Sequence, residues 1–170
     1  MGESVPDLTM SDAIDIPETS PLRYLGGMAA LNLPSATGTG DWHMEQTFFR
    51  QRQTRSRSFI SGVGCATDTT ALLGDTGVFD CTALVDELKI PHAAGPVYAA
   101  SHARAIADLV LAAVMRGEPA DFVRLDDFMP RAADKQQVFD LLAMAMPHLP
   151  AGPQQEVRKW QTKNAAERTL

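Results

Sequence analysis

The sequence predicts an α+β fold: a small antiparallel sheet in the first half of the chain, packed by three to five helices that lie mainly in the second half. Two patterns predict this class. Apolar side chains alternate with period two within residues 41–64, and they recur at helical spacing in the second half. The length of 170 residues suits one domain, and 45% hydrophobic residues can form a core without disulfides.

The predicted sheet is formed mainly by residues 41–64. Side chains from Asp41 to Phe49 alternate between two faces, which is typical of a strand. The apolar residues from Phe59 to Val63, interleaved and followed by glycines, resemble a second strand. The polar, basic stretch 50–58 lies between them, so the three segments together predict a hairpin.

Four helices are expected, over residues 81–90, 101–116, 132–146 and 153–163. The second has the clearest pattern, with Ser101 as a candidate N-cap and Gly117 as a stop. Its apolar positions follow the spacing i, i+3, i+4, i+7, i+8 and are Ile106, Leu109, Val110, Ala113 and Val114.

The segment Ser20–Ala29 has a weaker helical pattern. Ser20 followed by Pro21 suits a helix start. However, Gly26 and Gly27 would each cost about 1 kcal/mol in a helix interior relative to alanine. The two glycines therefore indicate an unfavourable helix, a turn or a site of close backbone packing.

The domain boundaries follow from composition. We expect a disordered acidic leader over residues 1–19, a single α+β domain over 20–163 and a frayed tail over 164–170. The leader has five acidic side chains and no Lys or Arg, the reverse of a signal peptide, and no apolar run is long enough to span a membrane. These features predict a cytoplasmic protein.

Charge and cysteine content exclude several classes of protein. Fifteen Lys and Arg against 21 Asp and Glu give a net charge of −6, which argues against a protein that coats nucleic acid with its whole surface. Cys65 and Cys81 lack the paired spacing of a zinc site and are expected to be reduced, small apolar residues. We expect no metal and no cofactor.

One group of residues is a candidate for catalysis. Asp41, His43 and Glu45 are close in sequence, and on a strand His43 and Glu45 would project from one face. Such a pair can transfer protons or bind a metal, although a solvated strand face has the same pattern more often. His102 is expected only to begin a helix, where its polarity needs no further explanation.

A glycine-rich stretch leads into the predicted strand 41–49. Thr37-Gly-Thr-Gly-Asp41 could let backbone N–H groups approach a phosphate. It lacks the Lys-Ser/Thr of a Walker loop and does not complete a Gly-x-Gly-x-x-Gly fingerprint. We therefore interpret it as a turn.

The most unusual segment is a run of four arginines within eight residues. Arginine suits bidentate contacts with carboxylates or phosphates, so this run indicates a contact surface, although a solvated hairpin tip would have the same composition. The partner-binding residues predicted here are the arginines and two neighbouring aromatic side chains: Trp42, Phe49, Arg50, Arg52, Arg55 and Arg57.

Three short stretches carry a resemblance: Leu22-Arg-Tyr-Leu-Gly-Gly27, Gly40-Asp-Trp-His43 and Phe79-Asp-Cys-Thr82. They resemble small bacterial proteins encoded beside abortive-infection nucleotidyltransferase toxins. The resemblance implies a cytosolic antitoxin or companion protein and assigns no catalytic residue. The predicted helices 81–90 and 101–116 are joined by a long link instead of a tight turn, which argues against DNA binding by a helix-turn-helix.

These observations lead to one leading prediction and two alternatives. The leading prediction is a non-catalytic, antitoxin-like interaction protein of a bacterial mobile or defence locus, which binds and inhibits a partner protein; the resemblance implies a nucleotidyltransferase-type toxin. One alternative is a nucleic-acid-binding accessory protein that uses Arg50–Arg57. The other is a small hydrolase or transferase that uses Asp41, His43 and Glu45.

Overall fold

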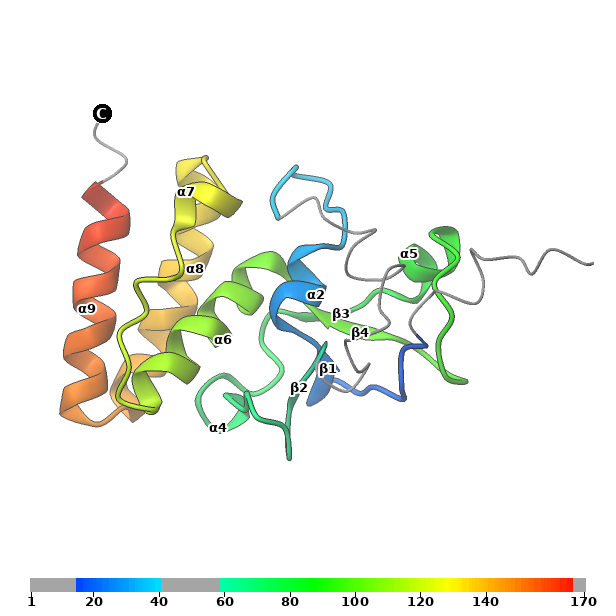
Figure 1. Cartoon of the computed structure of the whole chain (residues 1–170), viewed down its shortest axis with the longest axis horizontal. Helices are drawn as coiled ribbons and strands as arrows, with labels where there is room; N and C mark the ends of the chain where they lie inside the picture. Colours follow the sequence, from blue (N-terminus) through cyan, green and yellow to red (C-terminus); the bar gives the residue numbers. More distant parts are fainter. Residues whose placement is uncertain (1–14, 41–58, 167–170) are drawn as a thin grey trace, which may run out of the picture.

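The structure is a computed structural model that describes residues 15–40 and 59–166 of the chain. It confirms the α+β class, with a small sheet in the first half and most helical residues in the second. The sheet has four strands in the order β2-β1-β4-β3 (Figure 1). The strands are β1 (Arg23–Leu25), β2 (Ile60–Gly62), β3 (Val78–Asp80) and β4 (Tyr98–Ala100).

The sheet is mixed, which corrects the antiparallel prediction. The pairs β1–β2 and β3–β4 are antiparallel, but β1 and β4 run parallel, with Leu25 opposite Ala99. Parallel neighbours need a long connection, and here the chain passes through two other strands before it forms β4. The predicted strand near 59–64 is confirmed as β2, whereas the predicted strand 41–49 lies outside the described residues.

All four predicted helices are confirmed, with ends that differ by a few residues: α5 (Thr82–Glu87), α6 (His102–Met115), α8 (Ala132–Ala145) and α9 (Ala151–Ala166). Two short helices were not predicted: α4 (Thr70–Leu73) and α7 (Leu125–Phe128). The weak helical pattern over Ser20–Ala29 is wrong in its first part, which forms β1, and only its end overlaps α2 (Gly27–Leu31). A 3-10 turn over Met146–His148 links α8 to α9.

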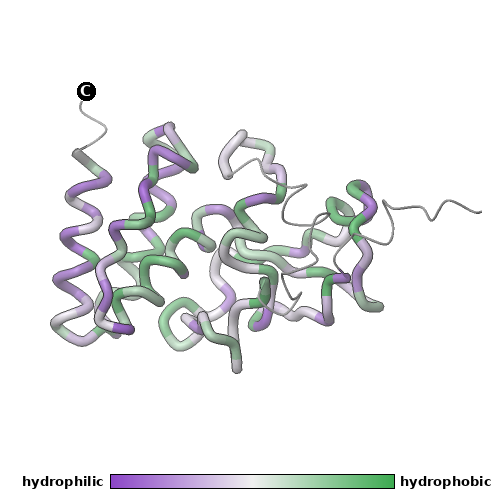
Figure 2. The backbone as a smooth tube through the Cα atoms, viewed as in Figure 1, coloured by the Kyte–Doolittle hydropathy of each residue, from purple (hydrophilic) through white to green (hydrophobic). Residues whose placement is uncertain are grey.

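Helix α6 is the centre of the molecule. It packs against α8, α9 and α2, and eleven of its fourteen residues are buried. In Figure 1, α7, α8 and α9 lie on one side of α6, and the sheet and α5 lie on the other. The apolar colour runs along α6, whereas α9 is mainly hydrophilic (Figure 2). Burial on several sides explains why α6 has the strongest apolar pattern in the sequence.

A buried ion pair fixes the first turns of α6. Arg104 and Asp108 are fully buried, and Arg104 Nε lies 2.8 Å from Asp108 Oδ1. Asp108 also accepts hydrogen bonds from the hydroxyls of Tyr24 and Thr69, each at 2.5 Å. Arg104 Nη1 donates to the carbonyl of Thr76. Burial, followed by the charge of Asp108, raises the pKa of the Tyr24 hydroxyl, so Tyr24 stays a donor. The network therefore ties β1 and the 69–76 segment to α6.

Packed structure begins before the predicted boundary at residue 20. Ile16 is 1% exposed, and its N–H donates to the carbonyl of Pro91 at 2.9 Å. At the other end, α9 continues to Ala166, three residues past the predicted end of the domain. In the part of the chain that the structure describes, no helix is long and apolar enough to cross a membrane.

Candidate functional site

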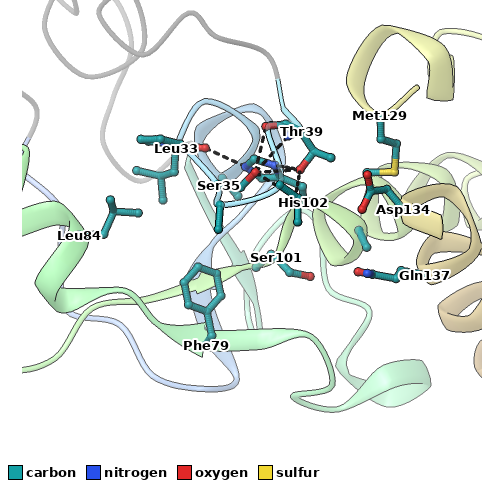
Figure 3. A pocket seen from close by; sticks show the side chains of 16 residues that line it. Leu33, Ser35, Thr39, Phe79, Leu84, Ser101, His102, Met129, Asp134 and Gln137 are labelled. Atoms are coloured by element: carbon teal, nitrogen blue, oxygen red, sulfur yellow. Dashed lines mark hydrogen bonds between the residues drawn. The ribbon is translucent and has the colours of Figure 1, made fainter. Parts of the chain in front are cut away.

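A cavity of about 400 Å³ opens between the sheet and the helical part of the molecule (Figure 3). Its lining comes from α2, β3, α5, the start of α6 and α8, together with the 33–39 loop. A cavity of this size, walled by apolar side chains with a few polar groups, is typical of a ligand or side-chain binding site. It is the candidate functional site of the described residues.

The cavity has two chemically different ends. Leu33, Phe79 and Leu84 lie toward one end, and Asp134 and Gln137 lie toward the other (Figure 3). Phe79 is 43% exposed although Ala99, its partner on β4, is fully buried. A large exposed aromatic side chain in a cavity offers apolar area that a partner could bury.

The 33–39 loop forms one wall of the cavity with three hydroxyl groups. Ser35 Oγ lies 3.1 Å from Thr39 Oγ1 and accepts a hydrogen bond from the Thr39 N–H at the same distance. Thr37 Oγ1 lies 3.4 Å from Thr39 Oγ1. These contacts agree with the interpretation of the glycine-rich stretch as a turn, because its hydroxyls bond mainly to one another.

Gly40 ends this loop in a position that only glycine can occupy. Its φ is +108°, and an added Cβ would lie 2.4 Å from the carbonyl oxygen of Leu31 and 2.6 Å from His102 Cε1. The Gly40 N–H donates to the carbonyl of Phe128 at 2.9 Å. The chain therefore leaves the cavity toward residue 41 from a fixed point.

His102 holds the same loop from inside the protein. Its Nε2 lies 2.8 Å from the Leu33 carbonyl, and its Nδ1 lies 2.6 Å from Thr39 Oγ1. A carbonyl only accepts, so Nε2 carries the proton and the neutral ring accepts the Thr39 hydroxyl at Nδ1. Burial lowers the pKa of His102. The sequence offered no signal for this role, because both partners lie more than 60 residues away.

Asp134 is also committed to a structural contact. Its Oδ2 accepts from Arg131 Nε at 2.9 Å, and Arg131 also donates to the carbonyl of Thr37. Arg131 therefore links the 33–39 loop to α8. Ser101 is used as well, since its Oγ caps α6 by accepting from the Arg104 N–H at 3.1 Å, which confirms the predicted N-cap.

Cys81 lies just before α5, where a helix N-terminus would favour a thiolate. The structure gives the opposite result, because the side chain is 2% exposed and burial raises its pKa to about 12. Cys65 is half-buried. The expectation of a small buried cysteine is confirmed at Cys81.

The residues singled out for partner binding all lie outside the described residues. These are Trp42, Phe49, Arg50, Arg52, Arg55 and Arg57, and the same is true of Asp41, His43 and Glu45. Both ends of the intervening stretch are described, at Gly40 beside the cavity and at Phe59 next to β2. Phe79 and Leu84, which line the cavity, were not predicted as site residues.

The described charges are distributed unequally. Residues 15–40 and 59–101 contain seven Asp and Glu against two Lys and Arg, and all seven acidic residues are exposed. Residues 102–166, which we call the helical half, contain eight acidic and eight basic residues. The net negative charge of the described residues therefore belongs to residues 15–40 and 59–101, which we call the sheet half and which also contribute the apolar end of the cavity.

Within residues 15–40 and 59–166, no three His, Cys, Asp or Glu side chains are grouped so that they could hold a metal ion. Comparisons with protein-family models, curated proteins and solved structures find no match to this chain.

Proposed function

We propose that this chain is a non-catalytic interaction protein that binds a partner protein and inhibits it. The observation that carries the proposal is the state of the ionisable side chains at the cavity. Both ring nitrogens of His102 and Oδ2 of Asp134 are engaged in hydrogen bonds that hold the fold. A general acid or base must exchange a proton with a substrate, and these contacts serve structure instead.

The arginine run is the proposed main contact with the partner. Arg50, Arg52, Arg55 and Arg57 follow Gly40 closely in sequence, and Gly40 is anchored by its hydrogen bond to Phe128. The composition of the run supports this proposal, because guanidinium groups form bidentate contacts with carboxylates. Arginine and aromatic side chains also contribute strongly at protein interfaces.

The partner class comes from the resemblance. Proteins encoded beside abortive-infection nucleotidyltransferase toxins are companions of those toxins, so we propose a toxin of this kind as the partner and a bacterial mobile or defence locus as the setting. An arginine-rich contact would bind carboxylates on such a protein. Inhibition then requires only that the complex block the toxin's working surface.

The test is affinity capture of native partners by the tagged full chain, with and without nuclease, followed by mass spectrometry. We expect a stoichiometric protein that survives nuclease treatment. The double substitution Arg52→Ala and Arg55→Ala should weaken capture of that protein at least tenfold, because it removes two of the proposed contacts.

The matched control is Arg116→Ala with Arg158→Ala, which removes the same charge from exposed positions in the helical half. Equal loss of capture in both double variants would show a general effect of charge and contradict the proposal. Recovery of nuclease-sensitive material alone would favour the nucleic-acid alternative. Turnover that is lost in His43→Ala, with the fold intact, would favour the hydrolase or transferase alternative.

A further inference from the structure

The apolar end of the cavity is the strongest feature that the proposed function does not use. Phe79 is 43% exposed and lines the cavity with Leu33 and Leu84. Phe79 belongs to β3, an edge strand of the sheet, and Leu84 belongs to α5. Cys81, the single residue between β3 and α5, donates its N–H to the carbonyl of Val97 just before β4 at 2.7 Å, so the junction of the two elements is fixed to the sheet.

Two acidic side chains lie close in sequence to the apolar residues of this end. Asp80 follows Phe79 and is exposed, and its carboxylate accepts hydrogen bonds from the N–H and hydroxyl of Thr82 at the start of α5. Glu87 is exposed and lies one helical turn after Leu84, so the two side chains are neighbours on α5. Residues 15–40 and 59–101 as a whole contain seven exposed Asp and Glu against two Lys and Arg, and this excess of negative charge favours a cationic partner.

We propose that the apolar end of the cavity, formed by Leu33, Phe79 and Leu84, binds a large apolar side chain on a basic segment of the partner protein. Asp80 and Glu87 contact the Lys or Arg residues that flank this side chain. The proposal rests on the proposed function for the existence of a partner. It adds a second contact, opposite in charge to the arginine run.

Two contacts of opposite sign would fix the orientation of the complex. A partner that presents acidic groups to the arginines and basic groups to the Phe79 site can dock in one direction only, because the reversed arrangement places like charges together. The size of the cavity, about 400 Å³, leaves room for an aromatic side chain and part of its backbone.

The test uses ¹⁵N-labelled full-length protein and three synthetic peptides, followed by backbone amide shifts in NMR spectra. The basic probe is Lys-Arg-Lys-Phe-Lys-Arg-Lys, the second replaces Phe with Ser, and the third replaces every basic residue with Glu. We expect the basic Phe peptide to shift the amides of Leu33, Phe79 and Leu84. The Ser and Glu peptides should bind at least tenfold more weakly.

Two substitutions test the site itself. Phe79→Ala should abolish the preference for Phe over Ser in the peptide, and Glu87→Gln should weaken both basic peptides severalfold. The matched controls are Phe122→Ala, an exposed phenylalanine in the helical half, and Glu118→Gln, an exposed glutamate there. The controls should bind both basic peptides as the unmodified protein does.

Several results would overturn the inference. These are the absence of amide shifts at millimolar peptide, equal affinity for the Phe and Ser peptides, or an equal loss of the preference for Phe in Phe79→Ala and Phe122→Ala. Shifts at Phe79 that depend on protein concentration alone would assign the site to a second copy of the chain. Shifts at Phe79 on removal of residues 1–14 would assign the site to the leader.

The same variants separate this inference from the proposed function. If Arg52→Ala with Arg55→Ala weakens capture of the partner and Phe79→Ala does not, the proposed function stands and the second contact is wrong. If no partner is captured but the peptide preference depends on Phe79, the proposed function fails and the site retains its specificity for basic apolar segments.

Discussion

His102 shows how much one side chain can determine at the edge of a cavity. Its ring joins α6 to the 33–39 loop through Leu33 and Thr39, and the loop forms a wall of the cavity. Because burial lowers the pKa of His102, the folded protein resists protonation of the ring. An unfolded histidine has a pKa near 6.5, so acidification through this value favours the unfolded state.

We therefore expect His102→Gln to lower the free energy of unfolding by about 1–3 kcal/mol at pH 7.5, because buried hydrogen bonds are lost. The contribution of His102 is complete above about pH 6.5 and falls as the pH drops below it. The difference in unfolding free energy between the unmodified protein and the variant should therefore be smaller at pH 5 than at pH 7.5. Urea denaturation across this pH range measures the difference.

The control for His102→Gln is His148→Gln, since His148 is exposed. Single variants must be compared because the contribution of His92 to stability changes with pH in the opposite direction. Its hydrogen bond to Asp86, at 2.7 Å, raises the pKa of His92, so its contribution is present at acidic pH and lost as the pH rises. If the loss of unfolding free energy in His102→Gln stays constant with pH, the proposed pH dependence of the His102 contribution is wrong.

At the scale of secondary-structure elements, the junction of β1 and β2 depends on how closely two backbones approach. Gly62 closes β2 with φ at +114°, and an added Cβ would lie 2.0 Å from the carbonyl oxygen of Leu22. Gly64 also has a positive φ, at +80°, but nothing lies within 4 Å of its added Cβ. The two glycines share the backbone requirement and differ in the space around them.

This difference predicts unequal effects of alanine at the two positions. Gly64→Ala should cost about 1–2 kcal/mol of unfolding free energy, the cost of a left-handed backbone with a Cβ. Gly62→Ala should cost clearly more, because β1 must also move away from β2. Urea denaturation of both variants provides the measurement. Equal costs would show that the close approach at Leu22 O relaxes freely.

At the scale of the whole molecule, the chain around Ile16 packs against a segment more than 70 residues later in the sequence. Ile16 is 1% exposed and packs in a cluster with Leu25, Val85 and Ile90. Its carbonyl accepts from the N–H of Ala93 at 2.8 Å. The chain just before β1 is therefore held against the link between α5 and β4.

Removal of this side chain should destabilise the whole domain. We expect Ile16→Ala to lower the free energy of unfolding by about 2–5 kcal/mol, because it leaves a cavity in a packed cluster. Leu22→Ala should cost less than about 1 kcal/mol, since Leu22 is 45% exposed. Thermal and urea unfolding of the two variants compare these costs. Similar values would mean that residues near Ile16 contribute little to the folded domain.

The helices were predictable because their signals are local. The apolar spacing of α6 and the Ser101 cap lie within a few residues of each other, so both could be recognised without knowledge of the fold. The sheet was only partly predictable. Strands β1, β3 and β4 are three residues each, too short for a period-two pattern, and Tyr24 and Leu25 in β1 fell within a weak helical pattern.

The paired glycines illustrate both outcomes. Gly26 and Gly27 were expected to lie in an unfavourable helix or to mark a turn or close backbone packing, and the structure shows close packing at Gly26 and the start of a short helix at Gly27. An added Cβ at Gly26 would lie 2.2 Å from Ser61 Oγ, and Gly27 begins α2 with φ at +54°. The glycine pair indicated an unusual backbone at this position, and the close approach of β2 to Gly26 explains the need for glycine there.

Local patterns in the sequence predict the α+β class, the four main helices and the N-cap at Ser101, because these depend on neighbours within one or two turns. The tertiary structure alone decided the parallel pairing of β1 with β4, the cavity beside Phe79 and the role of His102. Each joins residues separated by more than 40 positions, and a contact of that kind has no local pattern that a single sequence can display.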